Sequence, residues 1–145
     1  MISFDTNLAV YAANSAMPQH VAARQFLESL GPRKDVVVCE LMLVELYLKL
    51  RNAAIFPKPL SAAEAAERCQ SFRRNANWHL VESAPVMDQV WKLASSRDFA
   101  FRRIIDARLA LTLRHHGVTE LATTNEKDFA GFGFSRVWNP LKTSR

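Results

Sequence analysis

The sequence has few glycines and prolines, only two cysteines and no long apolar run. Four glycines and six prolines in 145 residues exclude collagen-like and low-complexity chains. Cys39 and Cys69 lack the spacing of a metal or redox motif, so we interpret them as thiols in or near the core. No basic leader with an apolar stretch opens the chain, and no apolar run approaches the roughly 18 residues that span a bilayer. We therefore expect a cytoplasmic protein that does not contact membranes.

The composition that is present is typical of one folded domain. Apolar residues make up 49% of the chain and charged residues 23%. A chain of this length buries about two thirds of the surface that its unfolded form exposes, so we expect a single domain over residues 1–145. The net charge of +5 fits a polyanionic partner such as nucleic acid, although charge alone does not identify one.

Short β-like apolar runs alternate with longer helical patterns along the chain. Strands are predicted at 2–4, 36–39, 78–81, 121–122 and 137–138, and helices at 19–30, 40–51, 61–75, 86–95 and 104–116. Ser61 and Glu64 form a capping-box pattern, and Gly117 marks a helix end. This alternation predicts an α/β fold whose parallel sheet is covered by helices on both faces.

The first predicted strand ends at Asp5, which is followed by Thr6 and Asn7. Ligands of parallel sheets bind beyond the carboxyl ends of the strands, and a carboxylate placed there faces the ligand crevice. The alternative is a structural role, in which Asp5 or Thr6 caps the next helix by accepting its unpaired amide hydrogens. Position alone favours neither interpretation.

Glu45 lies in the predicted helix 40–51, where three of its four neighbours one turn away are apolar. Its carboxylate must therefore lie on or beside the buried stripe, and an unpaired charge there is costly. The alternative is an ion pair with Lys49, four residues later. Glu40 differs because it begins the helix, where a negative charge complements the helix dipole.

Asp106 repeats this pattern in the predicted helix 104–116, with apolar residues one turn onward on the same face. An ion pair with Arg102 or Arg103, one turn earlier, is an equally simple explanation of its position. The helix alone does not decide between the two.

The acidic residues become informative as a set. Asn125 and Asp128 follow the short strand near residue 121, although Asp128 has the alternative of ending a turn. Together with Asp5, Glu45 and Asp106 they come from four segments that meet at or near one rim of the predicted sheet. Carboxylates so placed repel one another unless a cation neutralises them, and oxygen ligands suit Mg²⁺ or Mn²⁺. With a basic surface, the set predicts metal-assisted hydrolysis of a phosphodiester.

Several motifs, taken in order, resemble PIN-domain ribonucleases, specifically toxins of the VapC type from toxin-antitoxin modules. The resemblance covers almost the whole chain. Its parts are DTN at residues 5–7, ELYLKLRN with Glu45, IIDARLALTLRHHG with Asp106, and LATTNEKDF followed by WNP at residues 138–140.

The resemblance implies a three-layer α/β/α sandwich with a central, mostly parallel five-stranded sheet. It also implies an RNA substrate, a cognate antitoxin protein and a homodimer. Asp5, Glu45 and Asp106 match metal-binding acids of the family, and Thr6 and Thr123 match hydroxyls that orient them. Many members carry an aspartate where this chain has Asn125, so either Asn125 or Asp128 completes the Mg²⁺ or Mn²⁺ site.

Other classes fit less well. A haloacid-type phosphatase needs a second aspartate at the position of Asn7, and a receiver domain needs a phosphorylated aspartate after a central strand. A degenerate, non-catalytic PIN-fold interaction domain remains the main alternative. The arginines at 73, 74, 102, 103, 108 and 114 are candidates for phosphate contact, and the tryptophans at 78, 91 and 138 are interpreted as core residues.

Overall fold

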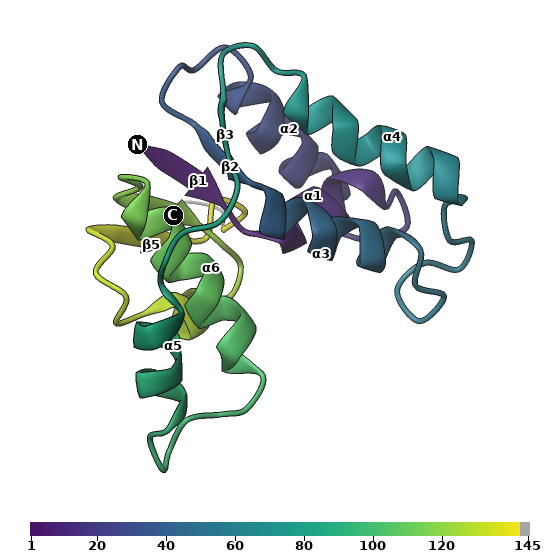
Figure 1. Cartoon of the computed structure of the whole chain (residues 1–145). Helices are drawn as coiled ribbons and strands as arrows, with labels where there is room; N and C mark the ends of the chain where they lie inside the picture. Colours follow the sequence, from purple (N-terminus) through teal and green to yellow (C-terminus); the bar gives the residue numbers. More distant parts are fainter. Residues whose placement is uncertain (143–145) are drawn as a thin grey trace.

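The structure is a computed structural model, and it describes residues 1–142. Short strands alternate with helices along the chain, as predicted (Figure 1). The elements are β1 (Ile2–Phe4), α1 (Thr6–Ala13), α2 (His20–Leu30), β2 (Val37–Cys39), α3 (Glu40–Leu50), α4 (Ala62–Arg73), β3 (His79–Val81), α5 (Met87–Ala94), α6 (Arg103–His115), β4 (Glu120–Ala122), the 3₁₀ turn η1 (Glu126–Phe129) and β5 (Arg136–Trp138).

All strand pairs are parallel, but they form two sheets. One sheet has the order β1-β4-β5, and β2 pairs with β3 in the other. A single bridge between Ile2 and Val36 connects them. One residue further along β1, the hydroxyl of Ser3 donates to the carbonyl of Val37 (2.7 Å). The predicted continuous five-stranded sheet is therefore divided, because a side chain connects β1 to β2 where a backbone ladder would continue.

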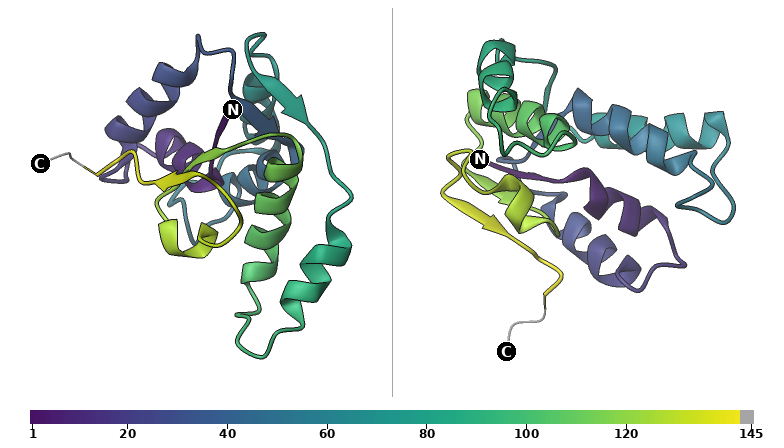
Figure 2. Two further views of the ribbon diagram at one scale, coloured as in Figure 1. Left: turned by 90° about the vertical axis from the view of Figure 1, so that its left-hand side faces the viewer. Right: turned by 90° about the horizontal axis from the view of Figure 1, so that it is seen from below.

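The helices lie in two groups beside the strands. Helices α1 to α4 lie together, and α5 and α6 project away from them as a pair (Figures 1 and 2). Helix α1 packs against both α2 and α3. It follows β1 after one residue and buries Leu8, Ala9 and Val10. This helix was not predicted, because its apolar run has no polar residues at a spacing that would reveal a helical period.

The predicted helix ends are confirmed where a specific cap forms them. Ser61 and Glu64 exchange both hydrogen bonds of the capping box, at 3.2 Å each. Gly117 has a φ of 85°, a left-handed conformation that favours glycine and ends α6. None of the helices within residues 1–142 is long and apolar enough to cross a membrane.

The core lies between the strands and the two helix groups. Strands β1 and β2 are fully buried, whereas β3 and β5 are partly exposed. Trp78 and Trp138 pack against the core, as predicted. The prediction for Trp91 was wrong, because its side chain on α5 is 59% exposed. A short helix packed on one side only leaves part of its apolar surface in solvent.

Candidate active site

The carboxyl ends of β1 and β4 bring Asp5 and Thr123 together. Phe4 pairs with Ala122 across the ladder, and the backbone N–H of Asp5 donates to the carbonyl of Ala122 (2.8 Å). The next residue of β4 is Thr123, whose hydroxyl donates to Oδ2 of Asp5 (3.0 Å). Both side chains are buried. The N–H of Asn125 donates to the same threonine oxygen (2.9 Å), so the loop after β4 helps to fix the orientation of the Asp5 carboxylate.

Asp5 occupies the N-cap position of α1 but does not cap it through its side chain. Instead, the N–H of Leu8 donates to the backbone carbonyl of Asp5 (3.1 Å). The carboxylate is therefore not used as a helix cap, and the structural alternative raised by the sequence is not what the structure contains. Burial raises the pKa of Asp5, the hydrogen bond from Thr123 lowers it, and the charge of Glu45 raises it.

Thr6 fixes the second acid. Its hydroxyl, on the first turn of α1, donates to Oε2 of Glu45 on α3 (3.1 Å). Thr6 is only 1% exposed, so this contact is built into the packing of α1 on α3. Glu45 does not form the alternative ion pair with Lys49 within residues 1–142. Lys49 instead donates to Oδ1 of Asn7 (2.7 Å).

Asp106 projects from the first turn of α6 and is partly buried. Neither Arg102 nor Arg103 forms an ion pair with it in the described part of the chain. Burial raises the pKa of Asp106 to about 6, and the charges of Asp5, Asp128 and Glu45 act in the same direction. The acids that the sequence placed on four separate segments therefore act on one another electrostatically.

Arg103 supports the loop that carries the fourth acid. Its guanidinium donates to the backbone carbonyls of Ala130 (2.9 Å) and Asp128 (3.4 Å) and lies over the ring of Phe132. From the sequence, Arg103 was a candidate only for an ion pair with Asp106 or for contact with a phosphate, and its bonds to backbone carbonyls were not predicted. Its contacts hold η1 against the start of α6, so Arg103 connects the segment of Asp106 to the segment of Asp128.

The fourth position remains shared between two residues. Asn125 immediately precedes η1, and Asp128 lies within it, with its N–H donating to the carbonyl of Asn125 (3.0 Å). Both side chains are exposed and line one hollow together with Thr124. Of the two, Asp128 carries the charge that raises the pKa of Asp106. The charge of Asp128 therefore acts on the other acids, whereas Asn125 is neutral and is connected to Asp5 through Thr123.

The donor set fits Mg²⁺ or Mn²⁺ in its chemistry. It consists of carboxylate and amide oxygens, which these ions prefer. The hydroxyl of Thr124 is buried without a hydrogen-bond partner in residues 1–142, so it requires a partner from outside the chain, such as water. Within the same residues, no three acid, histidine or cysteine side chains are close enough to hold one metal directly. Because Mg²⁺ keeps several waters, one or two direct carboxylates suffice.

Most of the candidate phosphate-binding arginines have structural partners. Arg73 pairs with Glu40 (2.7 Å), and Arg74 pairs with Glu67. Arg114 donates to the carbonyl of Val118 (2.8 Å). Two exposed arginines remain on and beside α6 without an ion pair in residues 1–142, namely Arg102 and Arg108.

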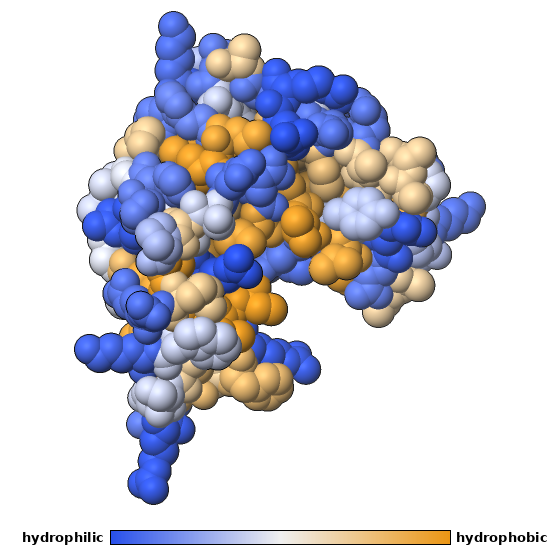
Figure 3. All heavy atoms as spheres, in the orientation of Figure 1, coloured by the Kyte–Doolittle hydropathy of each residue, from blue (hydrophilic) through white to orange (hydrophobic). Residues whose placement is uncertain are grey.

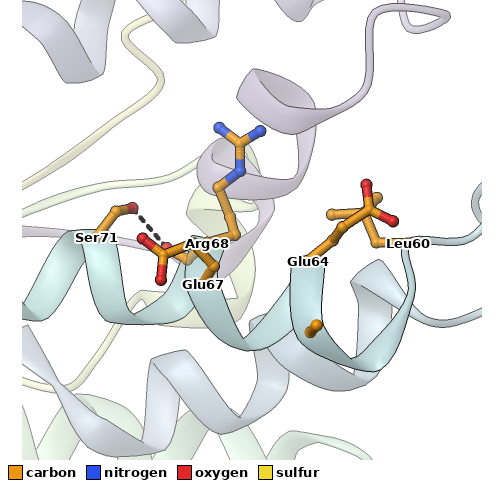
Figure 4. A pocket seen from close by; sticks show the side chains of 6 residues that line it. Leu60, Glu64, Glu67, Arg68 and Ser71 are labelled. Carbon is orange, nitrogen blue, oxygen red and sulfur yellow. Dashed lines mark hydrogen bonds between the residues drawn. The ribbon is translucent and has the colours of Figure 1, made fainter.

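A separate hollow lies along α4 (Figure 4). Its carboxylates have structural partners, because Glu64 belongs to the capping box and Glu67 pairs with Arg74. The hydroxyl of Ser71 is bonded within the helix, to the carbonyl of Arg68 (2.6 Å). None of the acids at the ends of β1 and β4 lines this hollow. The acid site is therefore the stronger candidate for catalysis.

Comparison with known proteins agrees with this geometry. The PIN domain family model matches residues 2–135. The chain belongs to the PIN domain family. It is also 57% identical over 141 residues to Ribonuclease VapC24 of Mycobacterium tuberculosis, with 97% of each chain covered.

Solved structures share the fold of this PIN domain. VapC20 of M. tuberculosis, described as a toxin that cleaves the sarcin-ricin loop, superposes with a TM-score of 0.65 at 17% identity, covering 92% of this chain and 96% of VapC20. FitAcB from Neisseria gonorrhoeae gives a TM-score of 0.62 at 21% identity, covering 99% of this chain and 100% of that chain. At these identities, the two structures support the fold and not a specific activity.

Proposed function

We propose that this PIN domain is a metal-dependent endoribonuclease and the toxin of a toxin-antitoxin module. The observation that carries the proposal is the grouping of the acids, because Thr123 and Thr6 hold the carboxylates of Asp5 and Glu45. The charges of these two acids and of Asp128, together with burial, also raise the pKa of Asp106 to about 6. Acids whose pKa values are raised by burial and neighbouring charges are typical of functional sites. The 57% identity to Ribonuclease VapC24 over nearly the whole chain supports the reaction class.

In this proposal, Asp5, Glu45, Asp106 and Asp128 would hold Mg²⁺ or Mn²⁺, one or two of them directly and the others through waters bound to the ion. The bound ion would supply an activated water and offset the charge that develops on the phosphoryl oxygens. Thr123 keeps the Asp5 carboxylate in one orientation, and Thr6 does the same for Glu45.

Two of the candidate arginines are proposed to contact the phosphates of RNA. Arg102 and Arg108 are exposed on and beside the helix that carries Asp106. They would bind RNA phosphates next to the acids, and the net charge of +5 would favour approach of the strand.

An antitoxin would restrain the toxin in the cytoplasm of its own cell. Figure 3 shows apolar side chains over the face that includes α3, where Val44 and Leu48 are exposed. A partner segment would cover this apolar face and place an arginine or lysine toward the acids, because a guanidinium matches carboxylates well. We also propose that the toxin forms a homodimer, as the family resemblance implies.

The deciding experiment compares expression of the wild type and of Asp5→Asn in bacteria, with growth and total RNA followed together. Wild-type protein should stop growth and degrade RNA, and the variant should do neither. Purified wild type should require Mg²⁺ or Mn²⁺ and lose activity in EDTA. Equal growth of both strains contradicts a nuclease toxin. A thermal midpoint that Mn²⁺ leaves unchanged favours the alternative, a non-catalytic PIN-fold interaction domain.

A further inference from the structure

Lys49 is a positively charged residue beside the acids, and neither the family match nor the relatives give it a role. It lies on α3 one turn after Glu45, and its ammonium donates to Oδ1 of Asn7 (2.7 Å). Asn7 directly follows Thr6, which binds Glu45 (3.1 Å). Thr6 and Asn7, which are adjacent in α1, therefore bind a carboxylate and an ammonium group that lie one turn apart on α3.

If Lys49 had only a structural role, we would expect it to form an ion pair with Glu45 along α3. A glutamate four residues before a lysine is well placed for an ion pair along the helix. Lys49 instead bonds a neutral amide and forms no ion pair within residues 1–142. An ammonium has three N–H donors, and the one to Asn7 is the only hydrogen bond that they make within residues 1–142. The other N–H donors of Lys49 are therefore available to a ligand.

The charge of Lys49 acts on the acids at the ends of two other elements. It lowers the pKa of Asp5, at the end of β1, and the pKa of Asp106, on α6. In both cases it opposes the larger effects of burial and neighbouring carboxylates. The hydrogen bond to Asn7, two residues after Asp5, and the position one turn after Glu45 place the half-buried ammonium beside these carboxylates, where it supplies one positive charge.

We propose that Lys49 is a second, built-in cation of the active site, which competes with the metal for the carboxylates and contacts the scissile phosphate. The inference rests on the proposed nuclease function and deepens it. A permanent positive charge reduces the net negative charge that a divalent ion meets, so it weakens metal binding. The same charge, held in place by Asn7, binds a phosphoryl oxygen and stabilises the charge that develops on it.

The test compares Lys49→Met with Lys49→Arg, which keeps the charge. Lys92→Met is the matched control, because Lys92 is an exposed lysine of α5 outside the site. Direct titration with Mn²⁺ in the absence of RNA should show binding to Lys49→Met that is tighter by on the order of tenfold. Lys49→Arg and Lys92→Met should keep the wild-type affinity.

Cleavage gives the second readout. At saturating Mn²⁺, the single-turnover rate of Lys49→Met should fall by on the order of a hundredfold, while Lys49→Arg retains most of it. Unchanged Mn²⁺ affinity in Lys49→Met overturns the inference, and so does a wild-type cleavage rate in that variant. A failure of the proposed nuclease function gives a different result. Wild type and Asp5→Asn would then cleave RNA equally, while the Mn²⁺ titration of Lys49→Met would still show whether Lys49 weakens metal binding.

Discussion

The hydroxyl of Thr123 donates a 3.0 Å hydrogen bond to Oδ2 of Asp5, and both side chains are buried. Parallel pairing of β1 with β4 creates this contact, because it places the residues that follow the two strands next to each other. The same threonine oxygen accepts the N–H of Asn125 (2.9 Å). One side chain therefore joins the first acid to the loop that carries the fourth.

Replacing Thr123 with valine tests this role. Thr123→Val keeps the shape but leaves the Asn125 N–H and the buried carboxylate without their partner. We expect a loss of about 1–2 kcal/mol in the free energy of unfolding and a fall of roughly 10- to 100-fold in cleavage. Thr112→Val is the control, since Thr112 is equally buried but bonds a carbonyl within α6. Similar losses of cleavage in both variants would contradict a positioning role.

The raised pKa of Asp106 predicts how stability depends on pH. Its folded-state pKa is about 6, above the unfolded value of 3.8, so protonation favours the folded state. Without metal, the free energy of unfolding should therefore be higher at pH 5 than at pH 7.5. After allowance for the partial exposure of Asp106, its share of the difference is about 1 kcal/mol.

Asp106→Asn removes this titration. The variant should lose RNA cleavage, and without metal at pH 7.5 it should be as stable as the wild type or slightly more stable. Chemical denaturation at the two pH values measures both effects. A large loss of stability in Asp106→Asn would instead indicate an ion pair with Arg102 or Arg103.

Mutations in the loop after β4 decide which residue completes the site. Asp128→Asn removes a charge that raises the pKa of Asp106, so the pH dependence of metal-free stability should shift to lower pH. It should also weaken Mn²⁺ binding, measured by direct titration. Asn125→Ala should change both quantities less. The reverse order would assign the fourth ligand to Asn125.

The sequence predicted the order of helices and strands better than the contacts between them. Apolar periodicity and the capping box placed five of the six α-helices and all five strands within a few residues, and the ends of β1 and β4 followed from them. It did not reveal that Lys49 bonds Asn7, because local spacing favours Glu45 and the choice depends on how α1 packs against α3. The division of the sheet after Ile2 likewise depends on a contact between residues distant in the chain.

Arg103 illustrates the same limit and gives a further prediction. Its bonds to the carbonyls of Asp128 and Ala130 form only once η1 folds back onto α6. Arg103→Met should loosen this loop and lower cleavage by about tenfold, with a loss of about 1 kcal/mol in stability. Arg97→Met, a change at an exposed arginine before α6, is the control. Equal activity of Arg103→Met and wild type would show that η1 does not need this support.

The exposed apolar face of α3 predicts where the antitoxin binds. Leu48 is 63% exposed and lies next to Lys49 at the acid site, so a partner that covers it can also reach the carboxylates. Leu48→Glu should weaken binding of the antitoxin, which we expect to be the product of a neighbouring gene, by at least tenfold, because it places a charge in an apolar contact. Cleavage by the toxin alone should persist, since Leu48 is not one of the acids.

Val21 provides the matched control, because it is also 63% exposed but lies on α2. Val21→Glu should leave antitoxin binding unchanged. In the partner, replacing the inserted basic residue with alanine should reduce inhibition more than affinity, because apolar contacts on α3 supply most of the binding while the inserted charge blocks the acids. Co-purification followed by RNA cleavage assays measures both. If no neighbouring product binds, or if a bound partner leaves cleavage at its full rate, α3 is not the surface through which this toxin is controlled.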